Sequence, residues 1–200
     1  MIAVVDYGGG NLGSLIAALG RRRAAFVVTS EPAEIAAAGA AILPGDGAFG
    51  ATMAALRERG LDEAVVATID AGKPFLGICV GMQVLYERSD EFGAHVGLGR
   101  LAGSVSRFAN APRVPHMGWN RLEIVRDHPF VRGLGPQPYA YFLHSYRVAV
   151  DANTLAQTDH GERFASIVAR GNVMATQFHP EKSQTTGAVL LDNFIRLSAC

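Results

Sequence analysis

Residues 74–81 read Pro-Phe-Leu-Gly-Ile-Cys-Val-Gly, a short hydrophobic run that leads into a cysteine with a glycine two residues before it and another two residues after it. The run from Pro74 to Ile78 has the length and apolar character of a buried strand, and helical spacing follows it. A nucleophile in this setting is typical of a nucleophile elbow, which projects the side chain from the carboxyl edge of a sheet. The helix N-terminus favours a thiolate at Cys79, and the N–H of Val80 can face an oxyanion. We therefore expect a nucleophile here rather than a small buried hydrophobe.

Short apolar runs alternate with amphipathic stretches around this elbow. This pattern is typical of parallel strands joined by crossover helices. The predicted strands cover residues 2–6, 25–29, 40–43 and 74–78, and the predicted helices cover residues 11–22, 49–59, 61–71 and 80–88.

The amino-acid composition changes after about Asp90, where glycine, proline and β-branched residues predominate. Short, hairpin-connected strands are expected there, so this half should be largely antiparallel. The predicted strands cover residues 97–108, 119–125, 139–148, 154–158, 165–170 and 172–178, and a closing helix covers residues 186–197. Because no linker or repeat separates the halves, residues 1–200 are expected to form one α/β domain.

Composition excludes several classes of protein. The 49% hydrophobic share excludes a disordered chain, and 18 basic residues balance 18 acidic ones, so no field attracts nucleic acid or an anionic membrane. The longest apolar run, residues 35–43, is far shorter than the roughly 20 residues of a membrane span. Two cysteines, Cys79 and Cys200, imply neither a disulfide framework nor a zinc site, and we expect Cys200 to be incidental. A cytoplasmic protein without a metal or cofactor is predicted.

A glycine-rich loop offers a competing interpretation. Residues 8–13 satisfy G-x-G-x-x-G, follow a strand and open a helix, and Glu31 lies just beyond the second strand. This arrangement is found in dinucleotide-binding sites. The alternative is a tight turn whose glycines permit positive φ and close packing. Because 200 residues leave little room for the substrate domain of a dehydrogenase, the turn is the better interpretation.

A cysteine nucleophile needs a base, and His179-Pro180-Glu181 follows the predicted strand 172–178. Proline favours an extended conformation for His179, and extended residues two apart point the same way, so Glu181 can hold the imidazole. A Cys79-His179-Glu181 triad is therefore predicted. The remaining loop histidines are expected to be solvated: His95, His128 and His160.

The turn Pro44-Gly45-Asp46-Gly47 lies at the carboxyl end of the third strand, on the sheet edge that carries Cys79. Its backbone can aim an N–H at a developing oxyanion. It also fits an ordinary strand-to-helix turn in which Asp46 caps the next helix, and both interpretations can hold together.

Together, these motifs resemble those of the class I, triad-type glutamine amidotransferases. The class is carried by residues 77–83, Gly-Ile-Cys-Val-Gly-Met-Gln, and residues 177–181, Gln-Phe-His-Pro-Glu. Within the family, the chain is most similar to the glutaminase subunits of imidazole glycerol phosphate synthase, through residues 6–12, 115–120, 141–146 and 182–184. The resemblance covers essentially the whole chain. It implies a flavodoxin-like fold, with a mixed, mostly parallel central sheet, helices on both faces and an added antiparallel sheet.

The resemblance also implies a reaction, in which glutamine and water give glutamate and ammonia. Cys79 would form a thioester, His179 would act as acid and then base, and Glu181 would orient it. The N–H groups of Val80 and of the Gly45-Asp46 turn would hold the oxyanion. The residues implied to hold L-glutamine are Gly45, Gln83, His144, Ser145 and Tyr146.

A partner is implied as well. In this family the ammonia passes to a (β/α)8-barrel cyclase subunit, which makes imidazole glycerol phosphate and an aminoimidazole carboxamide ribotide in histidine biosynthesis. The glycine loop then belongs to the face that meets the cyclase, and no nucleotide is bound there. Positions that match the interface are Asn11, Met117, Trp119 and Lys182.

One departure from the family is Asp46, where an apolar residue is common. A carboxylate aimed at the oxyanion would oppose it, so we expect the Asp46 side chain to face away and cap the helix. Rival assignments are the glutaminase of another pathway, such as anthranilate or pyridoxal phosphate synthesis, and a non-catalytic partner subunit. The segments 115–120 and 179–184 argue against the first, and the intact triad argues against the second.

Overall fold

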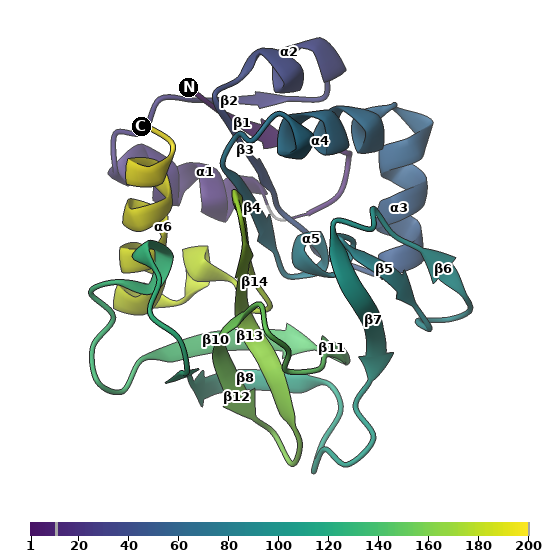
Figure 1. Cartoon of the computed structure of the whole chain (residues 1–200), viewed down its shortest axis with the longest axis vertical. Coiled ribbons are helices and arrows are strands. Elements are labelled where there is room, and N and C mark those ends of the chain that lie inside the picture. Colours follow the sequence, from purple (N-terminus) through teal and green to yellow (C-terminus); the bar gives the residue numbers. More distant parts are fainter. Residues whose placement is uncertain (11, 200) are drawn as a thin grey trace.

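Figure 1 shows the computed structural model, which describes residues 1–10 and 12–199. An eight-stranded sheet runs through the molecule in the order β2-β1-β3-β4-β14-β13-β12-β9. Its parallel part comprises β2 (Phe26–Thr29), β1 (Ile2–Val5), β3 (Ala40–Leu43), β4 (Phe75–Ile78) and β14 (Val173–Thr176). The antiparallel extension comprises β13 (Arg163–Arg170), β12 (Thr154–Asp159) and β9 (Glu123–Ile124).

Helices cover both faces of this sheet, as β1 illustrates. All its residues are buried, with Ala3 and Val5 in one hydrophobic cluster and Ile2 and Val4 in the other. Strands buried on both faces have continuous apolar sequences, and this strand reads Ile-Ala-Val-Val. One face packs against α2 (Pro32–Ala37), α3 (Phe49–Glu58) and α4 (Leu61–Asp70), and the other against α1 (Leu12–Arg21) and α6 (Gln184–Leu197). The predicted mixed, mostly parallel sheet with helices on both faces is confirmed.

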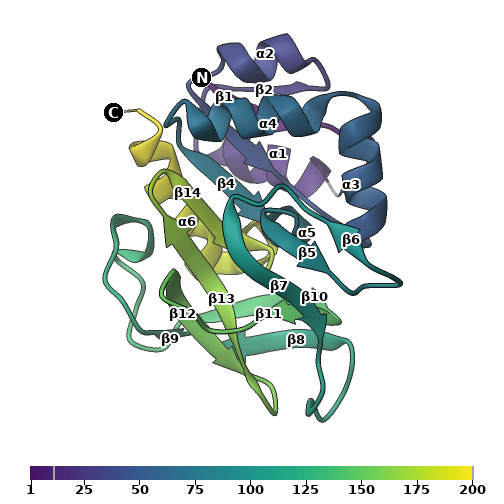
Figure 2. The same ribbon diagram turned by 45° about the vertical axis from the view of Figure 1, so that its right-hand side comes forward.

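Two smaller sheets extend the fold (Figure 2). One is an antiparallel ribbon of β8 (His116–Arg121) and β10 (Tyr139–His144). The other contains β11 (Tyr146–Val148), β7 (Leu101–Arg107), β5 (Tyr86–Ser89) and β6 (His95–Val96). Short 3-10 helices cover Pro129–Val131 (η1) and Pro180–Lys182 (η2).

The structure corrects several predicted elements. The helix predicted over 80–88 ends early: α5 covers only Val80–Gln83, and residues 86–89 form β5. Tyr86 is fully buried and pairs with Leu101 of β7, so a distant strand overrides the local helical spacing. The predicted strand 139–148 is interrupted at Ser145, and its halves belong to different sheets. The short helix α2 was not predicted.

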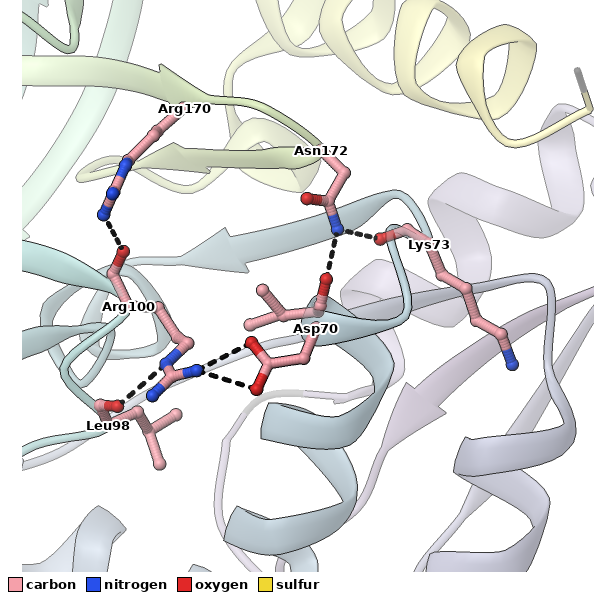
Figure 3. Close-up of polar contacts among 7 residues, drawn as sticks. Asp70, Lys73, Leu98, Arg100, Arg170 and Asn172 are labelled. Atoms are coloured by element: carbon pink, nitrogen blue, oxygen red, sulfur yellow. Dashed lines mark hydrogen bonds and ion pairs between the residues drawn. The ribbon is translucent and has the colours of Figure 1, made fainter.

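A polar staple lies at the amino-terminal edge of the parallel strands, opposite the edge that carries Cys79. Asn172, just before β14, donates from Nδ2 to the Ile69 carbonyl at 2.9 Å and the Lys73 carbonyl at 2.6 Å (Figure 3). It therefore ties the end of α4 to the turn that enters β4. Nearby, Arg100 pairs with both carboxylate oxygens of Asp70.

We expect Asn172→Ala to lower the free energy of unfolding by about 2 kcal/mol, because the Ile69 and Lys73 carbonyls each lose the Asn172 amide as a donor, although the Ile69 carbonyl still accepts from the Gly72 N–H. Urea denaturation would measure this. Asn153→Ala is the matched control, because the side-chain amide of Asn153 donates to the exposed Asp151 carboxylate, and its effect should be smaller. Equal stabilities for the two variants would contradict the stabilising role of the Asn172 side chain.

Candidate active site

Cys79 lies at the junction between β4 and α5, in a backbone conformation that few non-glycine residues adopt. Its φ is 56° and its ψ is −114°. Such strain persists only where the surroundings fix it, and it clusters at functional sites. Here the Cys79 N–H donates to the Thr176 carbonyl at 2.8 Å, and the Cys79 carbonyl accepts from Met82 and Gln83. The predicted elbow geometry is therefore present, with the side chain 7% exposed.

Glycines let the turn after β3 approach the elbow. A Cβ on Gly45 would lie 2.2 Å from Val80 Cγ1 and 2.6 Å from the Gly81 nitrogen. A Cβ on Gly81 would lie 2.0 Å from the Leu43 carbonyl oxygen. Only glycine fits at these contacts. The Gly45-Asp46 turn and the residue after Cys79 therefore lie together, as an oxyanion site requires.

Asp46 does not cap the next helix, which corrects one expectation. Its side chain is exposed, and the N-cap of α3 is Ala48, which has no side-chain cap. Gly47, with φ of 125°, and Ala48 separate Asp46 from the helix. Glu91 takes the role instead: its Oε2 accepts from the Phe49 N–H at 2.6 Å. Sequence reasoning missed Glu91 because 42 residues separate it from Phe49.

His179 and Glu181 form the pair that their spacing predicted. His179 is extended between β14 and η2, and its Nδ1 lies 2.8 Å from Glu181 Oε1. Both side chains are about 95% buried, with exposures of 5% and 4%. Burial alone would lower the pKa of His179, but hydrogen bonds to Cys79 and Glu181 outweigh it and raise the pKa to about 10. The arrangement therefore favours an imidazolium beside the cysteine.

We expect Glu181→Gln to lower the pKa of His179, because the amide keeps a hydrogen-bond acceptor but removes the negative charge. The imidazolium should then lose its proton at a lower pH than in the unaltered protein. NMR titration of the His179 ring would measure the shift. Glu58→Gln, at the exposed end of α3, is the control and should leave the titration unchanged. An unaltered His179 pKa in Glu181→Gln would count against the pairing.

The residues expected to hold glutamine come together beside the elbow. Gln83 is 4% exposed, and its Nε2 donates to the Tyr146 carbonyl at 3.0 Å and to Gln177 Oε1 at 3.1 Å. Both amide hydrogens are used, so its Oε1 is the atom left for a substrate donor. His144 Nδ1 lies 2.8 Å from the same Tyr146 carbonyl, and the Ser145 carbonyl accepts from the Phe108 N–H at 3.2 Å. The pairing of Gln83 with Gln177 was not predicted, because 94 residues separate the two.

The outward face of the β8–β10 ribbon is apolar. Met117 and Trp119 are 61% and 47% exposed, and they pair across the strands with Leu143 and Tyr141. The ribbon adjoins the triad, because the His179 N–H donates to the Tyr141 carbonyl at 3.3 Å. Lys182 lies in η2, two residues further along the chain than Pro180. Asn11 lies outside the described residues.

Other predicted features also have defined positions. Gly9 packs so closely that a Cβ would lie 2.6 Å from the Tyr7 ring, which favours the tight-turn interpretation of the glycine loop. His160 is not simply solvated, because its ring stacks on His116 with centroids 4.1 Å apart. His128 is half-buried and accepts from the Phe130 N–H through Nδ1, and half-buried His95 contacts Gly50.

Two further findings concern residues 1–10 and 12–199. Within these ranges, His, Cys, Asp and Glu side chains form no group of three or more that could hold a metal ion. No helix in the same ranges is both long and apolar enough to cross a membrane.

Comparisons with known proteins agree with this geometry. Residues 3–197 match the family "Glutamine amidotransferase class-I". A relative from Salinibacter ruber, named imidazole glycerol phosphate synthase subunit HisH, is 48% identical over 98% of this chain and 94% of its own length. Its namesake from Deinococcus radiodurans is 47% identical over 98% of this chain and 93% of its own.

Solved structures share the fold. A glutamine amidotransferase crystal structure has a TM-score of 0.78 at 23% identity, covering 100% of this chain and 99% of its own. A chain in a structure of PurLQS from Thermotoga maritima has a TM-score of 0.73 at 20% identity, covering 98% and 97%. The chain therefore belongs to the class-I glutamine amidotransferase family and, within it, to the HisH subunits of imidazole glycerol phosphate synthase.

Proposed function

We propose that this protein hydrolyses L-glutamine to glutamate and ammonia at Cys79, and that it passes the ammonia to the (β/α)8-barrel cyclase subunit of imidazole glycerol phosphate synthase. The observation that carries the proposal is the strained elbow, where the Cys79 side chain hydrogen-bonds to a His179 whose imidazole is paired with buried Glu181. A nucleophile, a base and an orienting group in contact are what acyl transfer through a covalent intermediate requires.

The first half-reaction forms a thioester. The Cys79 thiolate attacks the side-chain amide carbon of glutamine, and the amide oxygen becomes an oxyanion. The N–H of Val80 and an N–H of the Gly45-Asp46 turn stabilise this charge, because the glycine contacts hold both segments beside Cys79. His179 gives its proton to the leaving nitrogen as the carbon–nitrogen bond breaks. Ammonia departs, and the acyl group stays on sulfur.

The second half-reaction hydrolyses the thioester and regenerates the free enzyme. Neutral His179 takes a proton from water, whose oxygen attacks the thioester carbonyl. The carbon–sulfur bond breaks, and glutamate leaves with Cys79 again a thiolate beside imidazolium. Glu181 holds the ring through Nδ1 in both steps, so Nε2 faces the reacting atoms. Gln83 Oε1 and the 144–146 segment position the substrate.

We place the cyclase on the apolar face of the β8–β10 ribbon. Met117 and Trp119 are exposed on this face, which lies beside the triad. Lys182 and the glycine loop with Asn11 complete the proposed interface. A cytoplasmic location is part of the proposal, because a nucleophilic thiol has to remain reduced. The continuous central sheet, built from both halves of the sequence, supports one domain over residues 1–200.

Glutamate release from L-glutamine tests the proposal. The purified chain is assayed alone and then with the barrel cyclase and its nucleotide ligand. We expect ligand-dependent activity in the complex. No glutamate release in the ligand-bound complex would overturn the proposal and favour another glutaminase pathway.

A further inference from the structure

A chain of hydrogen bonds runs from β8 to the proposed glutamine site through two buried histidines. Asn120 Nδ2 lies 3.1 Å from His116 Nε2, and His116 Nδ1 lies 3.0 Å from His144 Nε2. His144 Nδ1 lies 2.8 Å from the Tyr146 carbonyl, which also accepts from Gln83. The exposures of His116 and His144 are 3% and 6%, so water cannot replace these partners.

The direction of donation is fixed from the inner end. A carbonyl oxygen only accepts, so His144 Nδ1 must carry hydrogen and donate to Tyr146. A neutral imidazole has one N–H, which leaves His144 Nε2 as an acceptor. His116 Nδ1 must then carry hydrogen and donate to it.

The contacts of Asn120, at the outer end of the chain of hydrogen bonds, require the same direction of donation. Asn120 Nδ2 donates to the Asp159 carbonyl at 2.9 Å, and Asn120 Oδ1 accepts from the Arg121 N–H at 2.8 Å. The amide orientation is therefore settled, and Nδ2 faces His116 Nε2 as a donor. His116 Nε2 must be bare, so its hydrogen is on Nδ1. The contacts at both ends of the hydrogen-bond chain therefore assign the Nδ1–H tautomer to His116.

Protonation of either ring would break the chain, because an N–H would face another N–H. Burial opposes it too: burial and His160 lower the pKa of His116 to about 4. Burial lowers the pKa of His144 to about 3, aided by His116, His160 and His179 and opposed by the bond to Tyr146. The phenyl rings that pack against the pair are those of Phe108, Phe142 and Phe164.

We infer that His116 is a positioning residue: its Nδ1–H holds His144 in the Nδ1–H tautomer. His144 thereby fixes the Tyr146 carbonyl, and through this shared acceptor it also fixes the Gln83 amide. This tautomer is maintained by an acceptor at one end and a donor at the other. Without the His116 donor, His144 could place its hydrogen on Nε2. Its Nδ1 lone pair would then face the Tyr146 carbonyl, and residues 144–146 would have to move.

Tautomer measurement tests the inference directly. The full chain with nitrogen-15-labelled histidine gives ring nitrogen and proton correlations that distinguish the two neutral tautomers, with His116→Phe identifying the His116 signals. We expect both His116 and His144 as neutral Nδ1–H rings at pH 7. An Nε2–H tautomer or an imidazolium at either position would overturn the assignment.

Kinetics tests the positioning role, and this arm rests on the proposed glutaminase activity. His116→Phe keeps the ring stacking on Phe142 but removes the donor, whereas His116→Asn keeps a donor where Nδ1 lies. In the ligand-bound cyclase complex, we expect His116→Phe to raise the KM for L-glutamine about tenfold with little change in kcat. His116→Asn should restore the KM.

The outcomes are distinct. An unchanged KM in His116→Phe, or no recovery in His116→Asn, would overturn the positioning role. An inactive wild-type complex would overturn the proposed function instead, and the tautomer measurement would still decide whether the histidine chain is present.

Discussion

Cys79→Ala is expected to lower glutaminase activity at least about 1,000-fold in the cyclase complex, because alanine has no thiol with which to form the thioester. Glutamate release at saturating L-glutamine measures the loss. The free thiol at Cys79 is buried in the elbow, so the substitution removes one atom and leaves the packing around it almost unchanged. Cys200→Ala is the matched control and should keep full activity. Residual activity in Cys79→Ala above one part in a hundred would rule out Cys79 as the nucleophile.

The same position tests the backbone strain. Cys79 has a φ of 56°, which alanine tolerates poorly and glycine adopts freely. We therefore expect Cys79→Gly to be more stable than Cys79→Ala by about 1 kcal/mol, although both are inactive. Thermal unfolding of the two variants would show it. A Cys79→Gly variant that unfolds first would mean that the elbow is not strained.

Gly81→Ala is expected to abolish activity and to cost about 3 kcal/mol of stability or more. Its Cβ would lie 2.0 Å from the Leu43 carbonyl oxygen, and backbone on both sides of this contact belongs to buried elements. Relief requires β3 to separate from the elbow. This movement would carry the Gly45-Asp46 turn away from Cys79, so the oxyanion would lose a donor as well.

Gly20→Ala is the matched control for Gly81→Ala. Gly20 lies in α1, and a Cβ there would meet nothing within 4 Å. Its alanine variant should be as active as the unaltered protein and slightly more stable, since alanine favours a helix. Denaturant unfolding and the glutamate assay distinguish the two variants. A Gly81→Ala protein with normal activity would show that the elbow does not need this contact.

Local sequence was sufficient where the chemistry depends on neighbours along the chain. The strand before Cys79 and the glycines around it specify a sharp turn, and the two-residue spacing of His179 and Glu181 places them on one side of an extended segment. Both predictions were confirmed because each needs only a few consecutive residues to adopt their preferred backbone conformation.

Tertiary structure decided the features that join distant segments. Glu91 caps α3 across 42 residues, and Gln177 accepts from Gln83 across 94. Residues 86–89 became a strand because β7 offered a hydrogen-bonding edge that no local pattern reveals. The rings of His116 and His144 come within hydrogen-bonding distance only because antiparallel pairing sets the two residues opposite each other. Local backbone preference therefore determined where Cys79 and His179 lie, whereas burial of distant polar groups against one another determined what holds them in place.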